Sequence, residues 1–127
     1  MQEKFLFEYA VIRFVPRVER EEFLNVGVIL LCRATSFLEA RISIDVPRIM
    51  CLNSEIDLQV LQNNLIAFEN IAKGVKGSGA IGFYDIASRF RWLTATRSTI
   101  IQCSKVHPGF SGEPQETLSK LHQQLVL

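Results

Sequence analysis

The 127-residue sequence predicts an α+β fold, in which an antiparallel sheet of about four strands carries about three helices packed on it. Three apolar segments in the first part of the chain predict a three-stranded N-terminal meander. A later segment with apolar residues at spacings of three and four predicts an amphipathic helix. Hydrophobic residues make up 48% of the chain, enough for an ordinary core, so we expect a single domain over residues 1–127.

The first strand is predicted over Phe5–Val15, which is rich in aromatic and β-branched residues. Both faces of this segment are largely apolar, with Glu8 and Arg13 as the exceptions. A strand with two apolar faces is expected in the centre of a sheet, covered on both sides. Pro16 ends the strand because proline has no N–H to donate to a neighbouring strand.

Two further strands complete the predicted meander. Val26–Cys32 is an apolar run and is expected to form a buried strand. The short turn Ala34–Ser36 then leads to a third strand, which begins at Phe37 and alternates between apolar and polar residues. The residues expected to face the core are Leu38, Ala40, Ile42 and Ile44, and those expected to face solvent are Glu39, Arg41, Ser43 and Asp45.

The clearest helix is predicted over residues 55–73, where the apolar side chains form one face. Ser54 is its expected N-cap, and Gly74 is the glycine expected after its last turn. A shorter helix is expected over Asp85–Leu93. The last helix is expected to begin at Pro114, because proline suits the first position of a helix.

Three segments lie between or beside these helices. Ser98–Ser104 is expected to be the fourth strand. His107–Pro114 contains two prolines and two glycines and is expected to be a turn. Gly74–Gly82 contains a G-x-G-x-x-G spacing, but it follows a helix and not a strand. We therefore interpret it as a mobile linker, with a ligand-binding loop as the alternative.

The charge of the chain is nearly balanced, with 14 basic and 13 acidic residues and a net charge of +1. This balance provides no overall field that would attract nucleic acid or an anionic membrane surface. The N-terminal residues do not resemble a signal peptide, and no run of about 18 apolar residues could span a membrane. We therefore expect neither nucleic-acid binding nor a membrane association.

The three cysteines, Cys32, Cys51 and Cys103, are widely spaced, form no C-x-x-C pair and have no neighbouring histidine. This pattern does not indicate a metal site, and we expect no cofactor. Such cysteines are typical of a reducing compartment, so we expect a cytoplasmic protein. His107 and His122 have no cysteine or acidic neighbour at ligand spacing and are expected at the surface.

The first group of candidate functional residues lies at the start of the second strand. Glu22 could act as a general base there, and Asn25 could donate and accept hydrogen bonds. The alternative is structural, because asparagine caps turns and Gly27 lets a neighbouring chain approach the strand closely. Asparagine and glycine are turn residues first, so the structural interpretation is favoured.

The second group is the segment Arg89–Arg97, which contains the three arginines Arg89, Arg91 and Arg97. A guanidinium binds phosphate or carboxylate through two hydrogen bonds, and Trp92 could stack on a base. The alternative is that the arginines lie on the solvent-exposed face of a helix and that Trp92 belongs to the core. The candidate ligand-binding residues are Asn25, Arg41, Arg89, Arg91 and Arg97.

Several stretches of the sequence resemble a known family. Tyr9–Pro16 and Glu22–Val28 resemble the opening signature of bacterial domain-of-unknown-function family 3037. Arg89–Leu93, Arg97–Ile100 and the closing segment Pro114–Leu127 are similar to that family's second half. The resemblance covers nearly the whole chain and implies a free-standing cytoplasmic bacterial domain with no established reaction, cofactor or substrate. It also implies a protein partner, a kinase resembling the HipA-type toxin.

Together, these observations favour a binding or regulatory module for a protein partner or an anionic ligand. The first alternative is a small enzyme acting on a phosphorylated or nucleotide substrate, with Glu22 as base and an arginine stabilising charge. The second alternative is a nucleic-acid-binding module, whose affinity would fall steeply with salt. An exposed sheet edge or an apolar helix stripe could also support a homodimer.

Overall fold

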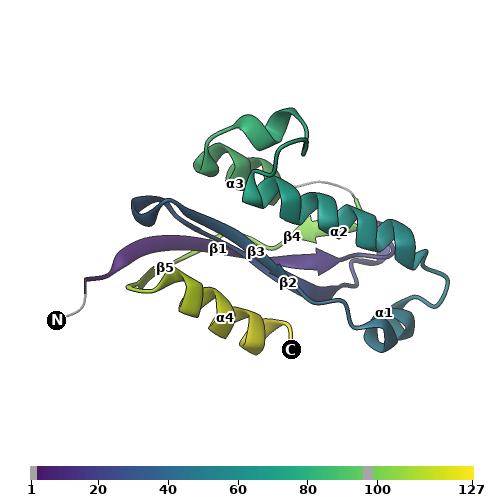
Figure 1. Cartoon of the computed structure of the whole chain (residues 1–127). Coiled ribbons are helices and arrows are strands. Elements are labelled where there is room, and N and C mark those ends of the chain that lie inside the picture. Colours follow the sequence, from purple (N-terminus) through teal and green to yellow (C-terminus); the bar gives the residue numbers. More distant parts are fainter. Residues whose placement is uncertain (1–2, 96–98) are drawn as a thin grey trace.

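The computed structural model describes residues 3–95 and 99–127, which form a sheet with helices on both of its faces (Figure 1). The strands are β1 Phe5–Phe14, β2 Leu24–Cys32, β3 Phe37–Ile42, β4 Ile101–Cys103 and β5 His107–Ser111. All of these strands are antiparallel to their neighbours, in the order β3-β2-β1-β4, and β5 also pairs with β1. The predicted α+β fold and its N-terminal meander are confirmed.

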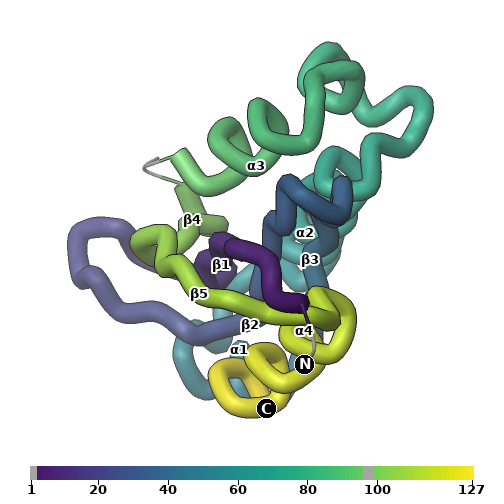
Figure 2. Tube along the Cα trace, turned by 90° about the vertical axis from the view of Figure 1, so that its left-hand side faces the viewer, coloured from purple at the N-terminus to yellow at the C-terminus, as the bar shows by residue number. Residues whose placement is uncertain are grey.

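Helices form a layer on each side of this sheet. The α-helices are α1 Val46–Leu52, α2 Leu58–Lys73, α3 Ile86–Thr94 and α4 Pro114–Leu125, and the 3-10 helices are η1 Val18–Arg20, η2 Arg33–Thr35 and η3 Ala80–Phe83. Two perpendicular views show α2 and α3 on one face of the sheet and α4 on the other (Figure 1 and Figure 2). No helix in the described ranges combines the length and the apolar character that crossing a bilayer requires.

Strand β1 is the central strand, as its two apolar faces predict. Its residues Ala10, Ile12 and Phe14 are completely buried in the core formed with α2 and α3. Phe7 is buried in a second core, which includes Leu118 of α4. Strand β2 pairs with one edge of β1, while β5 and β4 pair with successive parts of the other edge. The prediction of a central strand covered on both sides is therefore confirmed.

Helix α2 begins later than the sequence predicts, with Asp57 as its N-cap. The Asp57 carboxylate accepts hydrogen bonds from the main-chain N–H groups of Gln59 (3.0 Å) and Val60 (3.3 Å). The assignment of the cap to Ser54 was wrong, because two good capping residues lie within one turn of each other and their side-chain types do not rank them. The predicted end is confirmed, since Gly74 follows the helix with a φ of 68°.

The segment His107–Pro114 is not simply a turn, because most of it forms strand β5. Proline and glycine are compatible with β5 since the strand lies at an edge of the described sheet. Gly109 also makes room for the ring of Phe7, because a Cβ at this position would lie 2.5 Å from the Phe7 Cζ. The fourth strand is confirmed within Ser98–Ser104, although β4 is shorter than this range and Ser98 lies outside the described residues.

Helix α4 covers the face of β3 that was expected to meet solvent. The Arg41 guanidinium donates a hydrogen bond to the hydroxyl of Ser119 on α4. The Ser43 hydroxyl lies 2.8 Å from Nε2 of His122, which is only 8% exposed. The expectations of a solvent-facing Arg41 and Ser43 and of a surface His122 were wrong for one reason. A polar strand face can be covered when the helix on it supplies hydrogen-bonding groups.

We predict that protonation of His122 weakens this packing. Burial, and to a smaller extent the charge of Arg41, lowers the pKa of His122 from its ordinary value of 6.5. The unfolded chain therefore binds the proton more tightly than the folded chain does. The contribution of His122 to stability is complete above pH 6.5 and is lost as the pH falls below that value. The free energy of unfolding should accordingly decrease from about pH 7 to about pH 5.

The measurement is urea denaturation across this pH range for the wild type and for His122→Gln. Glutamine cannot be protonated but keeps a hydrogen-bonding group near Ser43, so the variant should show a smaller decrease. Hydrogen bonds to the carboxylates of Glu22 and Asp85 lower their pKa values from ordinary values of 4.5 and 3.8. Both groups therefore affect stability mainly below this pH range and do not obscure the effect of His122. Equal decreases in the two proteins would contradict the prediction.

Candidate functional site

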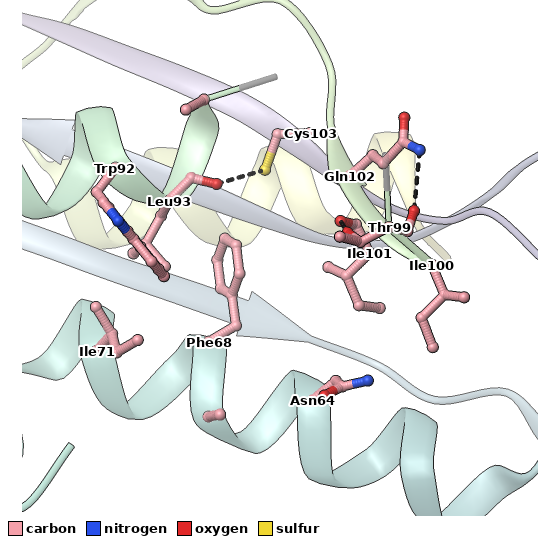
Figure 3. Close-up of a pocket in the computed structure, with 12 residues that line it drawn as sticks. Asn64, Phe68, Ile71, Trp92, Leu93, Thr99, Ile100, Ile101, Gln102 and Cys103 are labelled. Carbon is pink, nitrogen blue, oxygen red and sulfur yellow. Dashed lines mark hydrogen bonds between the residues drawn. The ribbon is translucent and has the colours of Figure 1, made fainter. Parts of the chain in front are cut away.

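A surface groove with a volume of about 310 Å³ lies between α2, α3 and β4 (Figure 3). Its lining is mainly apolar and comes from three separate parts of the chain. The apolar lining residues include Phe68 and Ile71 from α2, Trp92 and Leu93 from α3, and Ile101 from β4. The groove therefore exists only after α2, α3 and β4 have assembled on the sheet.

Helix α3 forms one wall of the groove because its side chains divide between core and surface. Phe90 and Leu93 are buried, with 2% and 4% of their surface exposed, and they anchor the helix on the sheet. The Cys103 thiol donates to the Leu93 carbonyl at 3.5 Å, which joins the end of α3 to β4. Trp92 is 39% exposed and borders the groove, so it belongs neither wholly to the core nor wholly to solvent.

Polar side chains complete the lining. Asn64 lies on the exposed surface of α2, and the Gln102 amide donates to the Thr99 carbonyl at 2.9 Å (Figure 3). Among the described lining residues, the only ionisable side chain is the thiol of Cys103. A site of this composition suits an apolar group with a few hydrogen bonds at its margin, and it offers no carboxylate for acid–base chemistry.

Arg89 has a structural role at the junction of α2 and α3. Its guanidinium donates to the carbonyls of Tyr84 (2.7 Å) and Ala72 (3.4 Å). It also packs beside Gly74, where a Cβ would lie 3.2 Å from the Arg89 Cζ. Arg89 therefore ties the end of α2 to the glycine-rich segment Gly74–Gly82, part of which forms η3.

Arg91 is exposed on α3, next to Trp92 in the sequence. The nearby carboxylate of Asp85 caps α3 by accepting from the Ser88 N–H at 2.7 Å. The hydrogen bonds from Ser88 lower the pKa of Asp85 most, and the charges of Arg33 and Arg91 add to this shift. The third arginine of the predicted cluster, Arg97, lies outside the described residues.

Asn25 and Arg41 are brought to α4 and not to the arginines of α3. The Asn25 side-chain amide donates to the Leu125 carbonyl at 3.0 Å, and Arg41 donates to Ser119. Gly27 lets β3 approach closely, because a Cβ there would lie only 2.8 Å from the Arg41 carbonyl oxygen. These contacts match the structural alternative for Asn25 and Gly27, in which both residues shape the fold.

Glu22 lies in the connection between β1 and β2. It is exposed, and its carboxylate accepts from Arg20 Nε at 2.5 Å. This hydrogen bond and the arginine charge lower the pKa of Glu22. A carboxylate with a lowered pKa is a weaker base at neutral pH, so its surroundings do not favour the role of general base.

The sequence interpretation missed two features of the site region. The groove was missed because its walls are far apart in the sequence, although the aromatic character of Trp92 was a visible signal. The second feature is Arg13, one of two charged residues in β1, which lines a neighbouring cavity with Phe23. Among residues 3–95 and 99–127, no group of three or more His, Cys, Asp or Glu side chains is placed to hold a metal ion.

In the described residues, the fold and the groove define an α+β domain whose antiparallel sheet separates two helix layers and is bordered by a mainly apolar groove. The chain belongs to the family described as a protein of unknown function (DUF3037), whose model matches residues 9–126. This match covers nearly the whole chain and agrees with the resemblance found in the sequence. No curated protein and no solved structure matches the chain.

Proposed function

We propose that this domain is a binding module for a protein partner, which inserts an apolar side chain into the groove between α2, α3 and β4. The observation that carries the proposal is the position of Trp92, 39% exposed at the border of an apolar cavity. Tryptophan is enriched among the few residues that supply most of the binding energy at protein interfaces. Covering its exposed ring with a partner removes apolar surface from water.

The size of the groove supports an anchoring side chain more than a whole small molecule. Its volume of about 310 Å³ is at the lower limit of small-molecule pockets, which span about 300–1,000 Å³. Its margin is open, because Ala67 and Asn64 on α2 are exposed. Polar groups around an apolar centre are typical of protein interfaces, where the margin excludes water from the central contact.

The exposed charge of Arg91 on α3 supports an acidic residue near the anchor. Of the candidate residues Asn25, Arg41, Arg89 and Arg91, only Arg91 is exposed, and it follows Phe90 and precedes Trp92 on α3. An exposed guanidinium attracts a carboxylate and increases the rate of encounter with an acidic partner. The partner segment we propose therefore carries an apolar anchor flanked by an aspartate or a glutamate.

The geometry supports the enzyme alternative less well. That alternative requires Glu22 and the arginines to share one pocket. Among the described residues, Glu22 pairs with Arg20 beside η1, Arg41 contacts α4, and Arg89 binds the end of α2. The views of the sheet place the β1–β2 connection and α3 well apart (Figure 1 and Figure 2).

The substitution Ala67→Phe tests the groove directly. Ala67 is exposed on α2 and lines the groove, so a phenylalanine there should fill the space without disturbing the core. We expect it to weaken partner binding at least tenfold, equivalent to about 1.4 kcal/mol. The measurement is comparative capture of cytosolic proteins on the immobilised chain, followed by titration of the captured protein against Trp92 fluorescence, since Trp92 is the single tryptophan.

The matched control is Ile66→Phe. Ile66 is the preceding residue of α2, 57% exposed and outside the groove lining. This variant adds the same aromatic ring to the same helix and should bind like the wild type. A partner that binds all three proteins equally would exclude the groove as the binding site.

A further inference from the structure

A second cavity, distinct in chemistry from the groove, lies under the connection between β1 and β2. Its volume is about 330 Å³, and Figure 2 shows the connection standing out from the sheet. Arg13 enters it from the central strand, and Phe23 and Glu21 enter it from the connection. Val15 and Val18, together with Gln102 and Cys103 of β4, form the remaining wall.

Arg13 is the unusual residue of this cavity. It belongs to a strand whose other residues are mostly apolar, and its Nε–H is buried without a hydrogen-bond acceptor among the described residues. The ion pairs identified within the described ranges, Arg20–Glu22 and Lys73–Glu69, do not include it. Its guanidinium carbon lies 4.0 Å from the centre of the Phe23 ring.

One donor of this guanidinium lacks a partner. Shielding the Nε–H from water removes a hydrogen bond that stacking on an aromatic ring replaces only in part. A methionine or leucine at position 13 would avoid this loss in a mostly apolar strand. A bound carboxylate would place acceptors at the edge of the guanidinium, because a planar guanidinium matches two carboxylate oxygens.

The other walls restrict the charge and shape of the anion. Glu21 lines the same cavity as Arg13, so the formal charges of these two lining groups cancel. A dianion such as a phosphate monoester would be repelled by the Glu21 carboxylate, whereas a single carboxylate beside Arg13 meets less repulsion. The ring of Phe23 and the valines favour a flat or apolar body behind that carboxylate.

We propose that Arg13 binds the carboxylate of a small organic monoanion in this cavity, with the apolar body of the ligand against Phe23. Gln102 and Cys103 line both this cavity and the groove, but Arg13, Glu21 and Phe23 do not line the groove, so substitutions at Arg13 and Ala67 test the two proposals independently. In this proposal the carboxylate contacts Arg13, and the apolar body of the ligand contacts Phe23 and Val18.

Benzoate is a suitable probe, because it combines one carboxylate with a flat apolar ring. Titration of the full chain with benzoate, followed by NMR, should give a saturable shift of the Arg13 Nε–Hε signal. Benzamide has the same shape without the charge and should bind at least tenfold more weakly. Inorganic phosphate tests the alternative anion and should also bind at least tenfold more weakly than benzoate.

The substitutions Arg13→Met and Arg17→Met form a matched pair. Both remove one positive charge, but Arg17 is exposed and lies outside this cavity. Arg13→Met should weaken benzoate binding at least tenfold, and Arg17→Met should change it less than twofold. Arg13→Lys keeps the charge but loses the planar fork, so it should also bind more weakly than the wild type.

Either of two results with benzoate would overturn the proposal. The first is an unchanged Arg13 Nε–Hε signal up to the solubility limit of benzoate. The second is equal affinity of the wild type for benzoate and benzamide. Both measurements use the wild-type chain, so they remain decisive even where Arg13→Met does not fold. Stronger binding of phosphate than of benzoate would likewise contradict the monoanion assignment.

Discussion

Replacing Phe14 with alanine should lower the free energy of unfolding by about 3–5 kcal/mol. Phe14 is completely buried, in the part of β1 that pairs with β2 on one side and β4 on the other. Truncation removes its apolar contacts and leaves a cavity that the paired strands cannot close. The loss is large compared with the total of about 5–15 kcal/mol that is typical of folded domains.

Urea denaturation monitored by circular dichroism measures this loss. The matched control is Leu6→Ala on the same strand, because Leu6 is 54% exposed. That variant should change the free energy of unfolding by about 0.5 kcal/mol or less. Similar losses in the two variants would show that burial at Phe14 does not determine the stability of β1.

Replacing Gly27 with alanine should lower the free energy of unfolding by about 1–3 kcal/mol, although only one methyl group is added. The new Cβ would lie 2.8 Å from the main-chain oxygen of Arg41 and 3.0 Å from Cγ1 of Ile42. A main-chain oxygen within a strand pair cannot move without disrupting the hydrogen bonds of β2 and β3. Thermal and urea denaturation of the variant would measure the effect.

A second substitution distinguishes the two closest contacts at Gly27. Ile42→Ala removes the contacting Cγ1 but leaves the Arg41 carbonyl in place. If the carbonyl is decisive, Gly27→Ala should cost nearly as much stability in the Ile42→Ala background as in the wild type. A negligible cost in that background would mean that the side chain, and not the strand backbone, sets the requirement for glycine.

The elements that were predicted correctly are those whose own residues determine their secondary structure. The two apolar faces of β1 predict a central strand, and the apolar stripe that includes Leu61 and Leu65 predicts α2. Strand β5 was missed because Pro108 and Gly109 favour turns in isolation. They belong to a strand only because the edge of β1 is available and Phe7 occupies the space beside Gly109.

The functional residues were less predictable, because their contacts join distant parts of the chain. The sequence identified Asn25 and Arg41 as candidate binding residues, but it could not show that both donate hydrogen bonds to α4. It likewise identified Trp92 but not the groove, whose opposite walls come from α2 and β4. Arg13 could have been singled out, since a single arginine in an apolar strand is a local signal.

Strand β1 pairs with β2 from the first part of the chain and with β5 from the last part, and this affects the order of folding. Strands β1 to β3 join through short connections, whereas Phe5 at the start of β1 pairs with Ser111 near the end of β5. Closing so long a loop costs much more conformational entropy than forming a hairpin, and non-local pairing slows folding. The meander can therefore form while the second edge of β1 and the core face under α4 are still uncovered. For that interval the nascent sheet exposes an apolar surface to other chains, and misassembly competes with folding.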